Sequence, residues 1–293
     1  MSGPLGSIAC NSVMHAPARK ERTFSISVPG CELFAVEVGD GAPLVMLHGG
    51  PGASHDYLRP QLDRLSEAHR RLVYYDQRGS GRSLLSTGAP WGTVGDHVDD
   101  LEAIRQALDI ANLDLCGYSW GGLLALHYAV AYPQHTGRLL LVSTAPAHSA
   151  WRPEVKTRMT QVAERSEVAL WKATLDLTDR RNRFAVAVAG YFLEPAQALQ
   201  LTPFLVRGSA EQAVWNSLGS YDLLPALEAI QVPALLLHGV QDPIPIESAR
   251  QTAAALGAPL VEIAHCAHVP YVEQPAVLFD AAIPFLRRAT WAL

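Results

Sequence analysis

Paired cysteines, basic runs and strong net charge are all missing from this chain. Its cysteines are scattered and form no CxxC pair, which argues against a disulfide framework or a zinc site and favours a reducing compartment. They are Cys10, Cys31, Cys116 and Cys266. The formal net charge is only -5 and no run of lysine and arginine stands out. Nucleic acids and anionic membrane surfaces are therefore not expected partners.

Long apolar runs are missing as well. The longest candidate, FAVAVAGYFL at residues 184–193, is far shorter than the roughly 20 apolar residues that a membrane-spanning helix needs. The start of the chain lacks a basic end followed by an apolar core, so no secretory signal is expected. These absences together predict a cytoplasmic protein. Residues 1–13 begin with MSGPLGS, and we expect them to be a vector-derived or disordered tail ahead of a natural start at Met14.

What is present is an ordinary globular composition in which strands alternate with helices. The 293 residues are 49% hydrophobic and 17% charged, which suits one domain with an insertion or two small domains. Early alternating runs, FSISV and LFAVEV, predict an antiparallel edge, and later continuous apolar runs predict strands covered on both faces. Helices are expected between them, over about residues 55–68, from Thr93 onward and over about 275–288. The continuous runs are LVMLH, LVYYD, LDLCG, LLLVST, ALLLHG and PLVEIA.

The middle of the chain has a different residue pattern from the segments on either side of it. Strand runs vanish between about residues 147 and 225, and helical patterns interrupted by proline and glycine replace them. Strands that alternate with helices predict an α/β fold with a mostly parallel central sheet wrapped by helices. Residues 14–146 and 226–293 would form this core, and residues 147–225 would form an inserted helical cap. Ligands in such folds bind at the carboxyl ends of the strands.

A serine is placed between one buried strand and the helix that follows it. The stretch reads Gly117-Tyr118-Ser119-Trp120-Gly121, a G-x-S-x-G pattern. A nucleophile on a sharp strand-to-helix turn needs glycines on both sides, because a Cβ there would keep strand and helix apart. The N–H groups at the start of the helix also favour an oxyanion nearby. Ser119 is therefore the predicted nucleophile.

The serine needs a base and the base needs an acid. A hydroxyl is a poor nucleophile until a histidine accepts its proton, and a carboxylate holds that histidine in the right tautomer. In this architecture the chain order is serine, acid, histidine. Asp242 follows the run ALLLHG and His268 follows the run PLVEIA, so both satisfy the order and lie at strand ends. We predict Ser119, Asp242 and His268 as the catalytic residues.

Other residues compete for two of these roles. His265 comes directly after its strand and is the alternative to His268, although a loop-bracing role suits it better. Asp222 lacks a preceding strand, and Glu247 stands where an acidic residue simply favours a helix start. After the run LLLVST, no acidic residue occurs before Glu154.

A second glycine-rich loop completes the predicted site. A tetrahedral intermediate needs two N–H donors aimed at its oxyanion. Trp120, which follows the nucleophile, is one predicted donor, and Gly50 in the loop HGGPG is the other. A phosphate-binding loop is the alternative for HGGPG, but neither G-x-G-x-x-G nor G-K-[ST] is present. No metal and no organic cofactor is required by this chemistry.

The combination HGGPG, DQRGSGRS and GYSWGG resembles the proline iminopeptidase branch of the α/β-hydrolase superfamily. This resemblance implies an α/β-hydrolase fold with Ser119, Asp242 and His268 as the triad and with Gly50 and Trp120 as the oxyanion donors. It also implies loop-bracing roles for a further group, Asp76, Gln77 and Arg78.

The predicted cap departs from that branch. Its prolyl aminopeptidases tend to carry cap glutamates that hold the free amino group of the substrate, one of them in a W-x-x-W-E-like segment. Here the corresponding segment reads ALWKATLDL, with Lys172 after the tryptophan. The cap glutamates are expected on solvated helix faces, and no substrate contact within residues 147–225 is assigned. They are Glu164, Glu167, Glu194 and Glu211.

The predicted function is a serine hydrolase that forms an acyl-enzyme with a small amide, N-terminal peptide or ester substrate. Its partner would be a small molecule or a short peptide. The alternatives are a carboxylesterase or lactonase acting on a small hydrophobic ester, and a non-hydrolytic relative such as a lyase or a receptor. An aspartate-nucleophile enzyme is disfavoured because serine occupies the turn.

Overall fold

A computed structural model describes residues 21–287 of the chain, so the expected tail at residues 1–13 lies outside the described residues. Within them eight strands form one sheet in the order β1-β2-β4-β3-β5-β6-β7-β8. Strands β1 and β2 pair antiparallel, as do β2 and β4, and every other neighbouring pair is parallel. The strands are β1 Glu21–Val28, β2 Cys31–Val38, β3 Ala42–Leu47, β4 Arg70–Tyr75, β5 Leu113–Tyr118, β6 Thr136–Val142, β7 Ala234–Gly239 and β8 Leu260–Ile263. The predicted mostly parallel sheet with an antiparallel edge is confirmed.

Both faces of this sheet are buried, which explains the continuous apolar runs. Side chains alternate between the two faces along a strand. In β3, Leu44 and Met46 belong to one hydrophobic cluster, while Val45 and Leu47 belong to another. A strand that is apolar at every position is therefore covered on both sides by helices.

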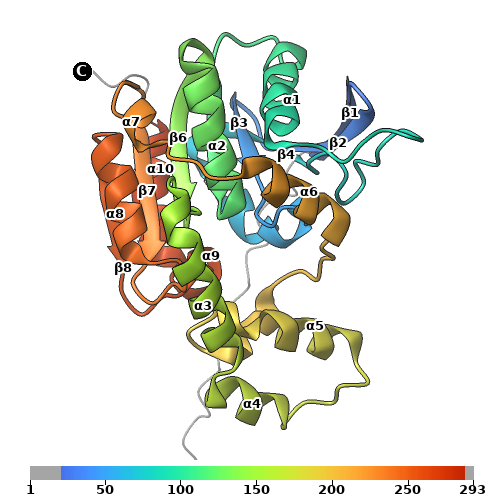
Figure 1. The fold of residues 1–293 in the computed structure, drawn as a ribbon, viewed down its shortest axis with the longest axis vertical. Helices are drawn as coiled ribbons and strands as arrows, with labels where there is room; N and C mark the ends of the chain where they lie inside the picture. Colours follow the sequence, from blue (N-terminus) through green and yellow to red (C-terminus); the bar gives the residue numbers. More distant parts are fainter. Residues whose placement is uncertain (1–20, 288–293) are drawn as a thin grey trace, which may run out of the picture.

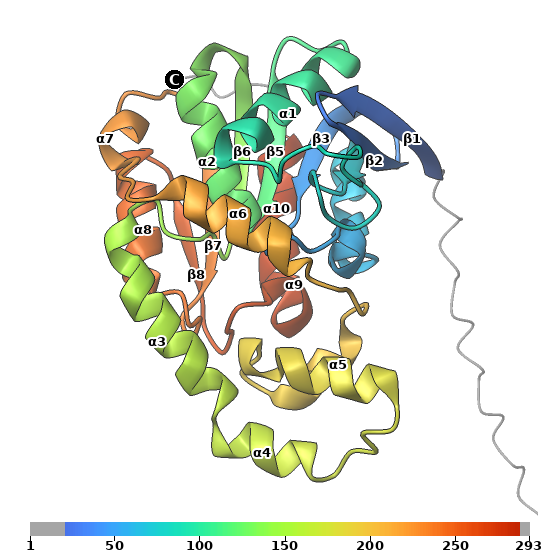
Figure 2. The ribbon, with the colours of Figure 1, turned by 45° about the vertical axis from the view of Figure 1, so that its right-hand side comes forward.

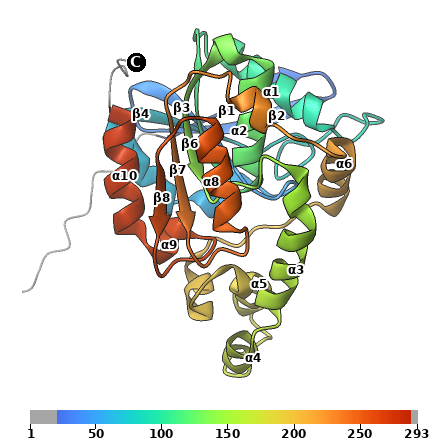
Figure 3. The same ribbon diagram turned by 60° about the vertical axis from the view of Figure 1, so that its left-hand side comes forward.

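Different helices cover the two faces (Figure 1). Helices α1 Val94–Ala107, α2 Trp120–Ala131 and α8 Ile246–Ala255 pack on one face with the short α7 Leu224–Leu227. The other face is covered by α10 Pro275–Arg287, the short α9 Pro270–Glu273 and the 3-10 helix η2 Gln61–Ala68. Figure 3 shows α8 and α10 on opposite sides of β7 and β8.

One predicted helix differs in kind. The segment expected to be a single helix over residues 55–68 consists of two 3-10 helices, η1 His55–Leu58 and η2. Arg59 and Pro60 separate them, and Pro60 has no backbone N–H with which to continue a helical hydrogen-bond pattern. The helix expected from Thr93 is α1, where Thr93 and Asp96 form a capping box.

The segment between β6 and β7 carries a group of helices and no strand among its described residues. We call residues 147–225 the cap segment; their separation from the core as a domain stays a prediction. Figure 2 shows α3, α4 and α5 beyond one end of the sheet, with α6 crossing back toward the core. The helices are α3 Arg152–Ala163, α4 Ser166–Lys172, α5 Arg180–Val188 and α6 Gly208–Leu218, with the 3-10 helices η4 Ser149–Trp151, η5 Ala189–Tyr191 and η6 Pro195–Gln200. A further 3-10 helix, η3 Pro133–His135, precedes β6.

The cap segment shares its hydrophobic core with the sheet. Val168, Ala185 and Phe192 belong to the same buried cluster as Leu278 of α10. The apolar run FAVAVAGYFL thus contributes to the core through its buried members. No helix within residues 21–287 is long and apolar enough to cross a membrane.

Candidate active site

Ser119 lies on a tight turn between β5 and α2. Its backbone has φ 55° and ψ -118°, and a positive φ is a conformation that L-residues rarely adopt. A Cβ on Gly117 would lie 2.6 Å from the carbonyl oxygen of Gly121. A Cβ on Gly121 would collide with the carbonyl oxygen of Leu47 in β3. Strand and helix can approach this closely only because both flanking residues are glycine.

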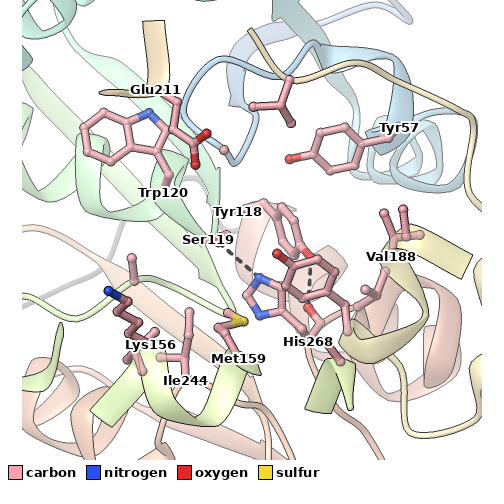
Figure 4. Close-up of a pocket in the computed structure, with 18 of the residues that line it drawn as sticks. Tyr57, Tyr118, Ser119, Trp120, Lys156, Met159, Val188, Glu211, Ile244 and His268 are labelled. Atoms are coloured by element: carbon pink, nitrogen blue, oxygen red, sulfur yellow. Dashed lines mark hydrogen bonds between the residues drawn. The ribbon is translucent and has the colours of Figure 1, made fainter. Parts of the chain in front are cut away.

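His268 and Asp242 meet Ser119 at the carboxyl ends of the strands. The Nε2 atom of His268 lies 3.1 Å from the Oγ atom of Ser119, and Figure 4 shows this contact in the cavity. The Nδ1 atom of His268 lies 2.9 and 3.0 Å from the two carboxylate oxygens of Asp242. Asp242 comes from the loop after β7 and His268 from the loop after β8. The structure therefore brings together the three residues that the sequence predicted.

The surroundings of Asp242 keep its carboxylate charged. Burial raises the pKa of Asp242, but the charges of His268 and His238 and the hydrogen bond from His268 outweigh it, so the pKa lies below its ordinary value. The backbone N–H of Ile244 also donates to Asp242, at 2.8 Å. An ionised Asp242 favours a proton on Nδ1 of His268, which leaves Nε2 free to accept the proton of Ser119.

The alternative residues have other partners. Asp222 lies 3.5 Å from His148, a residue at the start of the cap segment, and Glu247 lies 3.4 Å from Arg250 on α8. His265 is exposed, and its carbonyl oxygen accepts a hydrogen bond from Gln274. None of these printed contacts joins the alternatives to Ser119.

The two predicted oxyanion donors come from the glycine loop and from the first residue of α2. Gly50 and Trp120 both line the cavity that contains Ser119. Within residues 21–287 neither backbone N–H donates to a protein acceptor. The neighbouring amide of Gly49, by contrast, donates to the hydroxyl oxygen of Tyr57 at 2.5 Å. Two unused N–H groups beside a nucleophile are suited to bind a developing oxyanion.

Gln77 connects the two loops that carry these donors. Its side-chain amide donates to the carbonyl oxygen of His48 at 2.8 Å, and its side-chain oxygen accepts from the indole N–H of Trp120 at 2.8 Å. The backbone N–H of Gln77 donates to Nε2 of His48 at 3.1 Å. Burial lowers the pKa of His48 to about 4, so its imidazole is neutral near pH 7 and can accept this bond. Gln77 was predicted only as a loop brace, and the sequence carried no signal for its contact with Trp120.

Asp76 and Arg78 brace different parts of the structure. Asp76 is fully buried and accepts hydrogen bonds from His55 and Arg82. Arg78 forms a two-bond ion pair with Asp100 of α1, at 2.5 and 2.7 Å. Neither side chain lines the cavity, which agrees with the structural roles expected for them.

A cavity of about 1330 Å³ opens above Ser119 and is walled mainly by the cap segment. Apolar and aromatic side chains make up most of the wall. Tyr57 packs against Phe204, with ring centroids 4.3 Å apart, and Phe204 packs against Phe184 at 5.3 Å. Val188 and Tyr191 from the run FAVAVAGYFL also line it, so that run serves both the core and the cavity.

Charged side chains also reach the cavity wall. Glu211, in the first turn of α6, lines the cavity instead of facing solvent as the sequence had suggested. No hydrogen bond or ion pair joins its carboxylate to another described residue. Burial raises the pKa of Glu211 above its ordinary value. Glu164 lines the cavity too, whereas Glu167 and Glu194 do not.

The site does not resemble a metal centre. Among residues 21–287 no group of three or more histidine, cysteine, aspartate and glutamate side chains is placed to hold a metal ion. The described cysteines, Cys31, Cys116 and Cys266, are buried and unpaired.

Comparison with known proteins agrees with this geometry. Residues 42–275 match the family described as the alpha/beta hydrolase fold. A proline iminopeptidase of Lactobacillus helveticus is 32% identical over 226 residues, 70% of this chain and 76% of the relative. One of Lactobacillus delbrueckii subsp. bulgaricus is 29% identical over 262 residues, 82% and 88% of the two chains. The solved proline iminopeptidase of Mycobacterium smegmatis has a TM-score of 0.68 and 21% identity, over 90% of this chain and 97% of the other. The chain is a hydrolase that belongs to the alpha/beta hydrolase family, in its proline iminopeptidase-like branch.

Proposed function

We propose that the protein is a serine hydrolase that works through an acyl-enzyme. The observation that carries this proposal is the hydrogen-bonded chain from Ser119 through His268 to Asp242 at the base of the cavity. The Oγ atom of Ser119 attacks the substrate carbonyl while its proton passes to Nε2 of His268. The backbone amides of Gly50 and Trp120 bind the resulting oxyanion.

His268 then returns the proton to the leaving amine or alcohol as the tetrahedral intermediate collapses. The acyl group stays on Ser119 as an ester. A water molecule, deprotonated by His268, attacks this ester, and His268 returns the proton to the Oγ atom of Ser119 as the acid product leaves. Asp242 stabilises the imidazolium that forms in each half of the reaction.

We further propose that the favoured substrate carries a free amine near the scissile bond. An unpaired carboxylate in a mainly apolar cavity is costly unless a cation binds beside it, and Glu211 is such a carboxylate. An α-amino group, whose ordinary pKa is about 7.7–8.0, is largely a cation near pH 7. Glu211 would therefore accept hydrogen bonds from the ammonium of an aminoacyl substrate, which supports an aminopeptidase of the kind its relatives are named for.

Substrate preference tests this assignment. We expect L-prolyl arylamide to be hydrolysed faster than N-acetyl-L-prolyl arylamide and faster than a simple aryl ester of similar size. Glu211→Gln should lower kcat/KM for the free-amine substrate about 10- to 100-fold, the range for a hydrogen bond to a charged group, and should change the acetylated substrate little. Glu167→Gln is the matched control because Glu167 is exposed on α4, outside the cavity.

The aromatic and apolar wall favours a second candidate, a carboxylesterase acting on a hydrophobic ester. That function predicts equal or faster turnover of the aryl ester and no effect of Glu211→Gln.

A fluorophosphonate probe separates both candidates from a non-hydrolytic receptor. Its label should fall on Ser119 and disappear in Ser119→Ala, and labelling of another residue would reject the nucleophile.

A further inference from the structure

Helix α3 forms one wall of the cavity and carries three cationic side chains. Arg158 is paired with Glu154 at 2.6 Å, and neither residue lines the cavity. Arg152 and Lys156 do line it. Neither of these two forms an ion pair with an acidic side chain of residues 21–287. The unpaired cations of α3 are thus the two that face the cavity.

Helix stability does not explain this arrangement. Arg152 and Lys156 are four residues apart, a spacing at which like charges repel one another on the same helix face. Arg152 is also the first residue of α3, where the positive end of the helix dipole favours an acidic side chain instead. Two cations and the amino end of α3 together make this part of the wall electropositive, which suits an anionic ligand.

Arg152 is held in place while Lys156 is free to reach a ligand. The guanidinium of Arg152 lies 5.3 Å from the centroid of the Trp215 ring and donates to the carbonyl oxygen of Gly219 at 3.0 Å. The Trp215 ring lies 5.7 Å from the ring of Trp120, the residue beside the nucleophile. Lys156 is exposed, and its ammonium has no described partner.

The cationic wall and Glu211 come from different elements. Figure 4 shows Lys156 and Glu211 at separate places on the wall of the cavity, with Ser119 and His268 in the same view. Glu211 is on α6 and Lys156 is on α3. A substrate with charges of both signs could therefore place its amine at one of them and its anionic group at the other.

We propose that Arg152 and Lys156 bind a carboxylate of the substrate, and that the substrates are short peptides with both termini free. This inference rests on the proposed function, since the scissile amide would lie at Ser119 between the amine at Glu211 and the terminal carboxylate at α3. Arg152 supplies a fixed charge and Lys156 an adaptable one. Long peptides and amidated peptides have no carboxylate on the residue after the scissile bond, and they are poorer substrates.

The test compares the dipeptide L-prolyl-glycine with L-prolyl-glycinamide, which differ only in the terminal carboxylate. We expect the wild-type kcat/KM to favour the dipeptide about two- to fivefold, as for exposed ion pairs, and added salt to reduce that preference. Lys156→Met should remove most of it and Lys156→Glu should reverse it. Lysine and methionine have similar helix propensities, so α3 is preserved. Lys172→Met on α4 is the matched control and should keep the preference.

The outcomes separate this inference from the function on which it rests. If L-prolyl arylamide is hydrolysed but both peptides react equally, or if Lys156→Met keeps the full preference, the carboxylate subsite is rejected and the aminopeptidase assignment stands. If neither the arylamide nor either peptide is hydrolysed, the aminopeptidase assignment is rejected and the subsite with it, whereas the fluorophosphonate label on Ser119 tests the serine hydrolase separately.

Discussion

The backbone N–H of His268 donates a hydrogen bond of 3.0 Å to the carbonyl oxygen of Tyr191. The two rings are also neighbours, tilted by 36° with centroids 5.4 Å apart. Tyr191 belongs to η5 in the cap segment, whereas His268 belongs to the loop after β8. The cap segment therefore helps to position the proposed general base, in addition to enclosing the cavity.

Glu273 also links the cap segment to the loop that carries His268. Its buried carboxylate accepts hydrogen bonds from the amides of Ala267 and Val269, on either side of His268, and from the amide of Leu193 in the cap segment. We expect Glu273→Gln to lower kcat at least tenfold, because a side-chain NH2 group would face at least one of these N–H donors. Steady-state kinetics and a thermal melt should be measured together. An unchanged kcat would show that the loop is held without this carboxylate.

Asp242→Asn tests the proposed acid. The neutral side chain would favour the wrong tautomer of His268, so kcat should fall about 10⁴-fold while the fold is kept. Circular dichroism checks the fold, and Asp222→Asn is the control because Asp222 contacts His148. Near-wild-type turnover in Asp242→Asn would assign the acid to another residue.

Gln77→Met tests whether the oxyanion donors are braced. The change leaves the carbonyl oxygen of His48 and the indole N–H of Trp120 without their shared partner. We expect kcat and kcat/KM to fall together by about 10- to 100-fold with little change in KM, because the loss concerns the transition state. Affinity for a boronate transition-state analogue should fall in parallel. A rise in KM alone would instead indicate a role in substrate binding.

Gly121→Ala tests the tight turn at the nucleophile. The new methyl group would collide with the backbone carbonyl of Leu47, which strand pairing holds in place. We expect the free energy of unfolding to fall by about 3 kcal/mol, measured by urea denaturation. Gly208→Ala is the control, because a Cβ there meets no atom within 4 Å. Equal stability of the two variants would contradict the close approach of α2 to β3.

The lowered pKa of Asp76 predicts that the free energy of unfolding falls in acid. Burial raises the pKa of Asp76, but the hydrogen bonds and charge of His55 and the amide of Arg82 outweigh it, so the folded-state pKa is lowered. A carboxyl with a lowered folded pKa stabilises the protein above its unfolded pKa of about 3.9, and this contribution is lost as pH falls toward the folded pKa.

Asp76→Asn should therefore cost roughly 3 kcal/mol at pH 7, because the buried N–H groups of His55 lose the carboxylate that accepts from them, while Arg82 keeps only its exposed partner Asp56. The difference from wild type should shrink as pH falls below 3.9. Urea denaturation at pH 7 and at about pH 3 measures both quantities. A difference that stays constant with pH would mean that the charge of Asp76 contributes nothing.

The elements and the nucleophile could be predicted from local sequence because their signals are short-range. Apolar runs identified the buried strands, since both faces of the sheet are covered. Glycines on each side of Ser119 predicted the turn, since a Cβ at either position would collide with backbone atoms. The order of serine, acid and histidine, read along strand ends, selected Asp242 and His268.

Contacts between distant segments determine how the side chains are oriented, which no local pattern gives. His265 and His268 are three residues apart in one loop, and contacts of that loop with Tyr191 of the cap segment and with Tyr118 of β5 hold His268 where it reaches Ser119. From the sequence, Glu211 looks like an ordinary glutamate at the start of a helix. It becomes a cavity residue because α6 crosses the glycine loop, where the backbone amide of Glu211 lies close to Gly52. Such placements depend on how whole elements pack, which the residues beside each position do not encode.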